Sequence, residues 1–219
     1  MVDSRLGEVF KVALNLFING GYSRTKVKDI AKLTGFSVGL IYTLFSGKEA
    51  ILDFVLKCGI DTDYIESDIS LPITEDTLHT QESIIKLFNN STIEFSKHLR
   101  DISSYSFEQM LSDIFDTLYE LGIPCIMIEN NPNVWIQLEK HYAEYRIKFF
   151  NVLNEYVSEF IRLGEVRPLE SQIHSVRLIV ETLSWWCMHS RYTAYEKSDL
   201  SRDAAKAVCL DALVTAYKA

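Results

Sequence analysis

This chain of 219 residues has few of the residues that interrupt helices or cross-link secreted proteins. It contains only four prolines, and Pro72, Pro124 and Pro132 fall where we expect connections between helices. The four cysteines show no close spacing, which disfavours a disulfide framework or a zinc site and suits buried thiols in a reducing compartment. No apolar run reaches about 18 residues, and no leader of basic, then apolar, then small residues follows Met1. We therefore expect a cytoplasmic protein with no membrane partner.

Signatures of catalysis are missing as well. The sequence has no glycine-rich phosphate loop and no nucleophile elbow, so we expect no enzymatic activity. Three carboxylate–histidine pairs have helical spacing: Glu94 with His98, His141 with Glu144, and Glu170 with His174. None of them forms the doubled Glu-x-x-His pattern of di-iron bundles, and exposed ion pairs explain the spacing. We expect no metal and no cofactor, and a metal-binding helical bundle remains as an alternative.

Apolar residues make up 47% of the chain and aromatic residues 12%, which is enough for a sizeable core. Their spacing predicts an all-α fold of about nine helices. The predicted organisation is a helix-turn-helix head of three helices at residues 1–47, followed by a larger helical bundle at residues 48–219. Beyond the head we expect helices at about 48–65, 81–99, 106–121, 135–163, 171–195 and 201–217, with breaks at 70–80 and 124–132.

The clearest local pattern lies in residues 10–52, which read as three short helices and the start of a fourth. Gly35 supplies the positive φ that an abrupt reversal between two helices needs, and Ser37 is placed to cap the helix that follows. Apolar residues at helical spacing give each helix one apolar face: Val27, Ile30, Ala31 and Leu33 before the turn, and Ile41 and Phe45 after it. This arrangement is typical of a helix-turn-helix DNA-binding head.

The boundaries of the neighbouring helices carry similar signals. Gly20 and Gly21 end the first helix, and Thr25 is a suitable N-cap for the second. The run Ser46-Gly47-Lys48-Glu49 reads as a capping box at the start of the fourth helix. Helix ends are therefore predicted consistently along the head.

Three lysines occupy first turns of these predicted helices: Lys26 and Lys28 in the second, and Lys48 in the fourth. The helix dipole disfavours a cation there by about 0.3–1 kcal/mol. A phosphate, however, binds well to the backbone N–H groups of a helix N-terminus, and a nearby lysine adds charge. Residues 1–57 carry a net charge of +3, whereas the rest of the chain carries −11. The basic head therefore predicts contact with DNA, although an ordinary solvated surface would also contain such lysines.

Residues 8–55 resemble the N-terminal domain of the TetR/AcrR family of bacterial one-component transcriptional regulators. The resemblance rests on the runs ALNLFINGGY, TKVKDIA, TGFSVGLIYTLF and SGKEAIL, and it covers under a quarter of the chain. It implies a homodimer that places two recognition helices in successive major grooves of a palindromic double-stranded DNA operator. It also implies a divergent helical C-terminal domain that binds a small-molecule effector.

Carried over position by position, the resemblance assigns the DNA contacts. Base edges would face Val38, Gly39 and Thr43, with Leu40 alongside; phosphates would contact Thr25, Lys26, Ser37, Tyr42 and Lys48; Lys28 would reach a base or the backbone. For Tyr42, packing into the head's own core is the alternative. Two departures from the family pattern are Leu40 and Leu44, which stand where polar residues are common. Because the recognition helix also lacks Arg, Asn and Gln, we expect DNA shape or Lys28 to contribute more to specificity.

Aromatic residues recur at spacings of three and four along the long predicted helix, from Trp135 to Tyr156. Tryptophan and tyrosine offer flat apolar walls with one polar handle each, as a pocket for an aromatic or lipophilic effector requires. The candidate effector-binding residues are Tyr105, Phe107, Trp135, Tyr142, Trp185 and His189. Ordinary core packing is the alternative for each of them.

The last two predicted helices each have an apolar stripe, and the second stripe has small side chains that permit close helix approach. The candidate dimer-interface residues are Ile173, Val176, Val180 and Leu183 in the first stripe, and Ala205, Val208, Ala212 and Ala216 in the second. By resemblance, these helices pair across a two-fold axis. Packing within one protomer is the alternative.

Taken together, the patterns and the resemblance predict an effector-responsive transcriptional regulator. We expect it to be a repressor that binds a palindromic operator as a homodimer and is released by a small aromatic or lipophilic ligand. By resemblance, residues 48–56 of the fourth helix would couple the effector to the head. The alternative is an architectural factor that binds DNA constitutively and has no effector.

Overall fold

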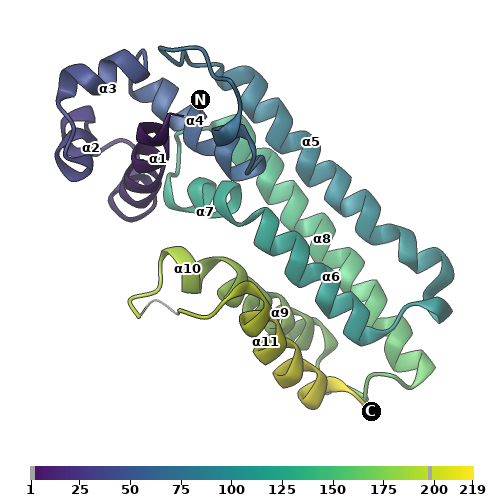
Figure 1. Ribbon diagram of the computed structural model, residues 1–219. Coiled ribbons are helices and arrows are strands. Elements are labelled where there is room, and N and C mark those ends of the chain that lie inside the picture. The colour runs from purple at the N-terminus through teal and green to yellow at the C-terminus, as the bar shows by residue number, and fades with distance from the viewer. Residues whose placement is uncertain (1–2, 197–198) are drawn as a thin grey trace. The chain divides into compact units, whose positions relative to one another are not determined.

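The computed structural model describes residues 3–196 and 199–219. Within these residues the fold is all-α, as predicted, and two isolated β-bridges are its only extended pairings (Figure 1). Contacts group the chain into two compact units, one of Met1–Ile85 with Leu121–Glu139 and one of Lys86–Glu120 with Lys140–Ala219. The domain boundary after residue 47 stays a prediction. No helix in the part of the chain that the structure describes is long and apolar enough to span a membrane.

The first unit contains the predicted head. Its elements are α1 (Ser4–Leu16), the π-helical turn η1 (Phe17–Gly21), α2 (Val27–Thr34), α3 (Val38–Leu44), α4 (Lys48–Ile60), the short 3-10 turn η2 (Tyr64–Glu66) and α7 (Gly122–Asn130). The fully buried side chains of Phe17, Ile30 and Ile41 come from three different elements of this unit. One shared apolar core therefore holds the three helices of the head together, as their apolar faces predict.

Local caps explain most helix ends in the head, and two predicted caps are wrong. Gly35 adopts φ 75° at the end of α2, and the Ser37 side chain accepts a hydrogen bond from the Leu40 N–H, both as predicted. The N-cap of α2 is Lys26 rather than Thr25, and the Asp29 carboxylate accepts a hydrogen bond from the Lys26 N–H at 2.9 Å. The N-cap of α4 is Gly47.

The predicted capping box at α4 does not form because its two polar side chains have partners elsewhere. The Ser46 hydroxyl donates to Glu75, and Glu49 accepts from the Tyr22 hydroxyl. The apolar face predicted for α2 is also narrower than expected, since Leu33 is 58% exposed.

Helix α7 occupies a segment where the sequence predicts a break. Pro124 is only the third residue of this helix, where the missing N–H would have no intrahelical partner anyway. Helix α4 ends at Ile60, before the predicted end near Ile65. The two helices lie very close together at Gly59, where an added Cβ would be 2.5 Å from Ile123 Cγ2. A side chain at position 59 would therefore push α7 away from α4.

The second unit contains α6 and the C-terminal helices. Its elements are the 3-10 segment η3 (Lys97–Ser104), α6 (Phe107–Glu120), α9 (Gln172–Ser184), the π-helical turn η4 (Trp185–His189), α10 (Ser190–Tyr192) and α11 (Arg202–Tyr217). Helices α5 (Thr77–Ser96) and α8 (Ile136–Leu163) contribute residues to both units. Gly164, with φ 78°, ends α8 as predicted, whereas the single helix expected at 171–195 is divided by η4.

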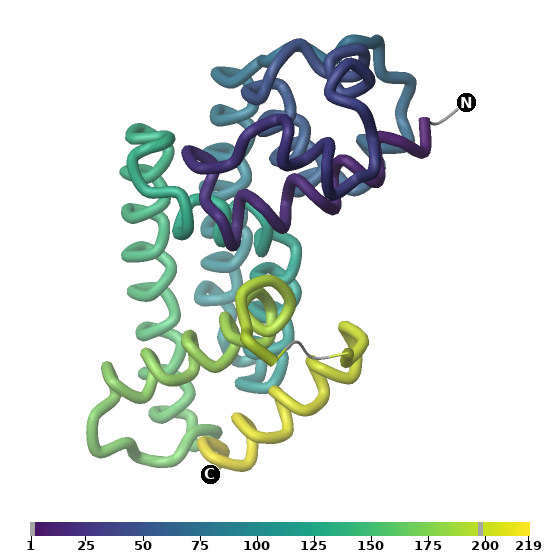
Figure 2. Tube along the Cα trace, turned by 90° about the vertical axis from the view of Figure 1, so that its left-hand side faces the viewer, coloured from purple at the N-terminus to yellow at the C-terminus, as the bar shows by residue number. Residues whose placement is uncertain are grey.

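The C-terminal segment closes the second unit. An isolated bridge pairs Val166 with Lys218, and the Arg167 N–H donates to the Tyr217 carbonyl at 3.0 Å. Figure 2 shows the C-terminus beside the loop that follows α8. This pairing anchors the end of α11, one of the two helices predicted to self-associate.

Candidate functional site

Helix α3 presents a distinct outer face. Val38 is 42% exposed and Tyr42 52% exposed, and Gly39 and Thr43 are exposed as well. Ile41 and Leu44 point the opposite way and are fully buried. Leu44 therefore packs inward and is not available to a base or phosphate. The side chains predicted to meet DNA at positions 38, 39, 42 and 43 share one accessible face, with Leu40 half-buried beside them.

The predicted phosphate contacts on α2 differ among themselves. Lys26 and Lys28 are exposed at the start of the helix, and Ser37 is exposed at the start of α3. Thr25, in contrast, is only 5% exposed, and its hydroxyl donates to the Gly21 carbonyl at 2.9 Å. This hydrogen bond gives Thr25 a role in fixing the turn between η1 and α2 and leaves little of its side chain for a phosphate.

Lys48 is turned into the protein. Its ammonium group donates to the Tyr22 carbonyl at 2.9 Å and to the Thr25 carbonyl at 3.0 Å. The same ammonium lies 4.0 Å from the centre of the Tyr22 ring, a cation–π contact. Lys48 therefore ties α4 to the turn before α2, and no sequence signal pointed to this structural role.

Tyr22 contacts Lys48 through its carbonyl and its ring, and it makes two further hydrogen bonds. Its hydroxyl donates to Glu49 at 2.9 Å, and its N–H donates to the Asn131 side chain at 2.5 Å. Burial and the Glu49 carboxylate raise the pKa of Tyr22 above its ordinary value, which keeps the phenol neutral. Tyr22 closes the GGY run on which the resemblance rests, but nothing in the sequence signals Asn131 as its partner.

A basic, two-helix surface with an exposed recognition helix defines the class of protein: a helix-turn-helix DNA-binding regulator. Residues 9–55 match the family model described as "Bacterial regulatory proteins, tetR family". The predicted resemblance is thereby confirmed, and residues 9–55 form a TetR-family helix-turn-helix head.

Curated relatives agree with this class. The chain is 24% identical over 202 residues to the uncharacterized HTH-type transcriptional regulator YfiR of Bacillus subtilis (strain 168), covering 91% of this chain and 86% of that protein. It is 37% identical over 62 residues to the HTH-type transcriptional regulator HbdR of Aromatoleum sp. (strain CIB), covering 28% of this chain and 27% of that protein. The first similarity extends well beyond the head.

Solved structures support the fold of the whole chain. The ketosteroid transcriptional regulator KstR2 of Mycobacterium tuberculosis has a TM-score of 0.52 at 18% identity, covering 100% of this chain and 97% of that one. The probable transcriptional regulatory protein RHA5900 has a TM-score of 0.56 at 13% identity, covering 96% and 97% of the two chains. At these identities the likeness concerns the fold alone.

The six predicted effector-binding residues are divided between the two compact units. Trp135 belongs to the first compact unit and is 4% exposed, whereas the other five belong to the second. Tyr105, Phe107 and Tyr142 are buried in aromatic contacts: Tyr105 stacks on His98 at 4.1 Å, Phe107 meets Phe160 at 6.0 Å, and Tyr142 meets Phe88 at 5.5 Å between ring centres. Core packing therefore describes these three residues in the structure.

Trp185 and His189 do come together. Their rings stack at 5.9 Å between centres, and both line an open groove of about 460 Å³ with Glu181, Thr182 and Trp186. Trp185 is 49% exposed. Trp185 and His189 are four residues apart in η4, so their side chains lie on the same side of the helix.

A second cavity in the same unit contains none of the predicted effector-binding residues, although two of its lining residues, Glu94 and His98, are one of the carboxylate–histidine pairs found in the sequence. It measures about 280 Å³ and is lined by Ser91, Glu94, Phe95, His98, Asp113, Asp116, Thr117 and Glu120. Tyr105 lies behind this cleft, because its ring stacks on His98 and its hydroxyl donates to Asp113 at 2.7 Å. The cleft has an aromatic wall, acidic groups and one imidazole.

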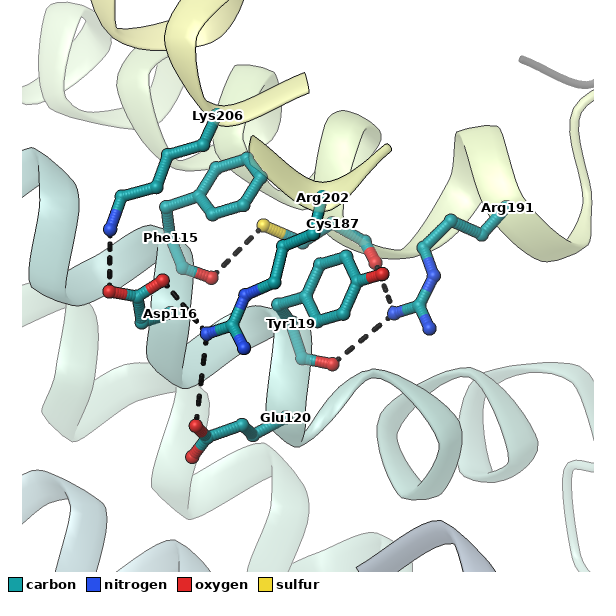
Figure 3. A network of polar contacts seen from close by, with 8 residues as sticks. All are labelled: Phe115, Asp116, Tyr119, Glu120, Cys187, Arg191, Arg202 and Lys206. Atoms are coloured by element: carbon teal, nitrogen blue, oxygen red, sulfur yellow. Dashed lines mark hydrogen bonds and ion pairs between the residues drawn. The ribbon is translucent and has the colours of Figure 1, made fainter. Parts of the chain in front are cut away.

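Two acidic residues of the cleft form ion pairs with basic residues of α11. Lys206 contacts Asp116 at 2.5 Å, and Arg202 bridges Asp116 at 2.9 Å and Glu120 at 3.8 Å (Figure 3). Burial raises the pKa of Asp116, but the two cations together outweigh it, and the net pKa is below its ordinary value. Arg202 and Arg191 also flank the Tyr119 ring, at 4.9 and 3.8 Å from its centre. These ion pairs therefore connect α11 directly to residues that line the cleft.

The predicted dimer-interface residues separate into two groups. Val176 and Leu183 are fully buried within the protomer, and Val180 and Ala205 are less than a tenth exposed. These four side chains pack within the protomer, and their part in a dimer interface stays a prediction. Ile173 is 57% exposed, Val208 is 49% exposed, and Ala212 and Ala216 are exposed. For these four the interface remains a prediction.

Cysteines and possible metal ligands add no further site. Cys58, Cys125, Cys187 and Cys209 are all buried free thiols, as the sequence predicts. Burial raises the pKa of Cys58 to about 12 and that of Cys209 to about 11, so neither thiol is a ready nucleophile. Among the residues that the structure describes, no three His, Cys, Asp or Glu side chains gather as a metal site would require.

Proposed function

We propose that this TetR-family regulator is a homodimeric, effector-responsive repressor that binds a palindromic operator. The observation that carries the proposal is the outer face of α3, where Val38, Gly39, Tyr42 and Thr43 are accessible while Ile41 and Leu44 hold the helix against the core. Side chains on such a face can meet base edges in a major groove. Lys26 and Lys28 at the start of α2 supply the phosphate contacts.

The proposed dimer forms through the exposed faces of α9 and α11. Ile173, Leu178 and Trp185 are each about half exposed or more on α9 and η4, and Val208 is 49% exposed on α11 beside Ala212 and Ala216. Apolar groups exposed on two neighbouring helices gain free energy when a second copy covers them. A two-fold dimer supplies the symmetry that a palindromic site requires.

The proposed effector site is the 280 Å³ cleft between α5 and α6. Phe95 offers an apolar wall, and the carboxylates and His98 offer hydrogen-bond acceptors, which suits an aromatic or lipophilic compound with a hydrogen-bond donor. Coupling between effector and operator requires only about 1–3 kcal/mol, which changes affinity roughly 5- to 150-fold.

A selection followed by a release experiment tests this function. Full-length protein is incubated with a random-sequence duplex library, and the most enriched duplex is titrated by fluorescence anisotropy against a scrambled duplex of the same length. We expect a palindromic duplex bound far more tightly than its scramble, and release by one class in a panel of aromatic, lipophilic and cationic compounds. Binding that no compound weakens would favour the constitutive alternative, and equal binding to all duplexes would refute operator recognition.

A further inference from the structure

The recognition helix is held at its end by a segment that the resemblance does not include. Residues 72–77, which we call the strap, lead directly into α5 and run beside the end of α3 (Figure 1). The Ile73 N–H donates to the Leu44 carbonyl at 2.8 Å, and the Ser46 N–H donates to the Ile73 carbonyl at 2.8 Å. These bonds form a short parallel bridge. Because the last four carbonyls of a helix lack intrahelical partners, the strap satisfies one that α3 leaves open.

Side chains reinforce the bridge from both directions. Ile73 is 5% exposed, and Phe45, its bridge partner, is fully buried. The Ser46 hydroxyl donates to the Glu75 carboxylate at 3.0 Å. The backbone N–H of Glu75 and this hydroxyl lower the pKa of the Glu75 carboxyl below its ordinary value, so it is ionised and accepts well at neutral pH. The strap is therefore attached through its backbone, a buried side chain and an exposed acid.

The other end of the strap is fixed to α4. Asp53 is 2% exposed, and its carboxylate accepts hydrogen bonds from the Asp76 N–H and, at 3.4 Å, from the Thr77 hydroxyl. Lys57 also approaches Asp76, at 3.7 Å. Helix α5 starts at Thr77, so the first turn of α5 and the exit of α3 are joined by a segment that is bonded at each end.

Within the connection between α3 and α4, the main restraint on the recognition helix is Phe45, which is fully buried and lies 5.2 Å from Phe54 between ring centres. Only the short run from Phe45 to Gly47 separates the two helices, and Gly47 caps α4 without a side-chain hydrogen bond. Gly47 is also extended, with φ −177° and ψ −173°. The direction in which α3 leaves the head therefore depends on the strap as well as on the core.

We propose that the strap positions the recognition helix for operator binding, with Ile73 and Glu75 as the positioning residues. The strap continues into α5, whose residues from Lys86 onward belong to the second unit and line the proposed effector cleft. The strap thus connects the start of α5 to the end of α3 and, through Asp53, to α4. This inference rests on the proposed DNA binding.

Substitution of Glu75 tests the positioning role, because loss of positioning and loss of charge change the affinity for DNA in opposite directions. Removing an acid close to a DNA-binding helix strengthens binding on electrostatic grounds. If the strap positions α3, Glu75→Ala instead weakens binding to the selected duplex, by about threefold for one exposed hydrogen bond. Glu75→Gln keeps an acceptor for the Ser46 hydroxyl and loses the charge, so it binds at least as tightly as wild type. Both variants change an exposed side chain, so we expect both to fold.

Ile73→Pro tests the backbone bond itself. It removes the N–H that donates to Leu44, and we expect about a tenfold loss of affinity for the selected duplex with little change for its scramble. Ile73→Ala keeps the N–H but loses most of the buried side chain, so it is the matched control, and any loss beyond that of Ile73→Ala reports the backbone bond. Circular dichroism establishes whether Ile73→Pro is folded; if it is not, the two Glu75 variants decide.

The outcomes separate the inference from the function on which it rests. If wild type selects no duplex, both proposals fall. If wild type selects a duplex and Glu75→Ala binds it as tightly as Glu75→Gln, the strap does not position the helix and this inference alone is overturned. Weaker binding by Glu75→Ala alone, with an unchanged affinity for the scramble, supports it.

Discussion

Asn131 and Tyr22, far apart in the sequence, are joined by a 2.5 Å hydrogen bond from the Tyr22 N–H to Asn131 Oδ1. The Asn131 Nδ2 donates to the Phe17 carbonyl at 3.1 Å and to the Met127 carbonyl at 2.8 Å. Asn131 is only 3% exposed. One buried amide thus uses its acceptor and both its donors to attach the end of α7 to the end of the first helix.

Replacing this amide should therefore cost stability. In Asn131→Asp the carboxylate faces the two carbonyls that Nδ2 now serves, and we expect the free energy of unfolding to fall by about 2–3 kcal/mol. Asn130→Ala is the matched control, because Asn130 makes one partly buried bond, to the Ile18 carbonyl at 3.2 Å. It should cost about 1 kcal/mol or less. Urea unfolding measures both, and equal small losses would mean that Asn131 is not a structural tie.

We expect the lysines of the head to have two different roles, contact with DNA and stabilisation of the fold. Lys26→Ala and Lys28→Ala are each expected to reduce the salt dependence of binding to the selected duplex, lowering the slope of log K against log salt by about one. Lys48→Met should leave that slope unchanged, because its ammonium serves the Tyr22 and Thr25 carbonyls, and should lower the free energy of unfolding by about 1–2 kcal/mol. Anisotropy titrations at several salt concentrations give the slopes. A reduced slope for Lys48→Met would restore its predicted phosphate contact.

The sequence was informative where structure depends on neighbouring residues. Gly35 must adopt a positive φ, and Ser37 can cap α3, because of bonds made within a few positions. Such signals are visible in a short window, which is why the turn and the recognition helix were predicted correctly. Pro124 was misleading because proline is excluded from a helix interior but tolerated in its first turn.

Contacts between residues far apart in the sequence leave no signal in a short sequence window. The partner of Tyr22 is Asn131, and the partner of Leu44 is Ile73; a side-chain amide or a backbone N–H can meet almost any carbonyl. Apolar periodicity also does not show whether an apolar stripe packs within the protomer or against a partner chain. Val176 and Ile173 lie in one predicted stripe, yet the first is core and the second is 57% exposed. Only the three-dimensional arrangement separates a face that packs inside the protomer from one left for a partner.

The difference between buried and exposed residues in these stripes allows a matched test of the proposed dimer. Val208→Glu places a charge on the exposed face of α11, and we expect it to convert the dimer to a folded monomer, since an unpaired charge is costly at an apolar interface. Ile147→Glu changes a residue of α8 that is 62% exposed and should leave the dimer intact. Val176→Glu should instead unfold the protein, because that side chain is fully buried. Light scattering after gel filtration measures the masses, and a dimeric Val208→Glu would place the interface elsewhere.

Asp53, which anchors the strap, should make stability depend on pH. Burial outweighs its hydrogen bonds and Lys57, and raises the pKa of this carboxyl above its ordinary 3.8. The fold therefore favours the neutral acid, whose contribution is fully present below pH 3.8 and is lost as the pH rises through the folded-state pKa. Asp53→Asn remains neutral and keeps an acceptor for the Asp76 N–H. At pH 7 it should unfold with a higher free energy than wild type, and the difference should vanish on acidification. Urea titrations between about pH 7 and pH 4, with the exposed Asp63→Asn as control, measure this; a less stable Asp53→Asn at pH 7 would mean that the carboxylate's bonds to the strap exceed its desolvation cost.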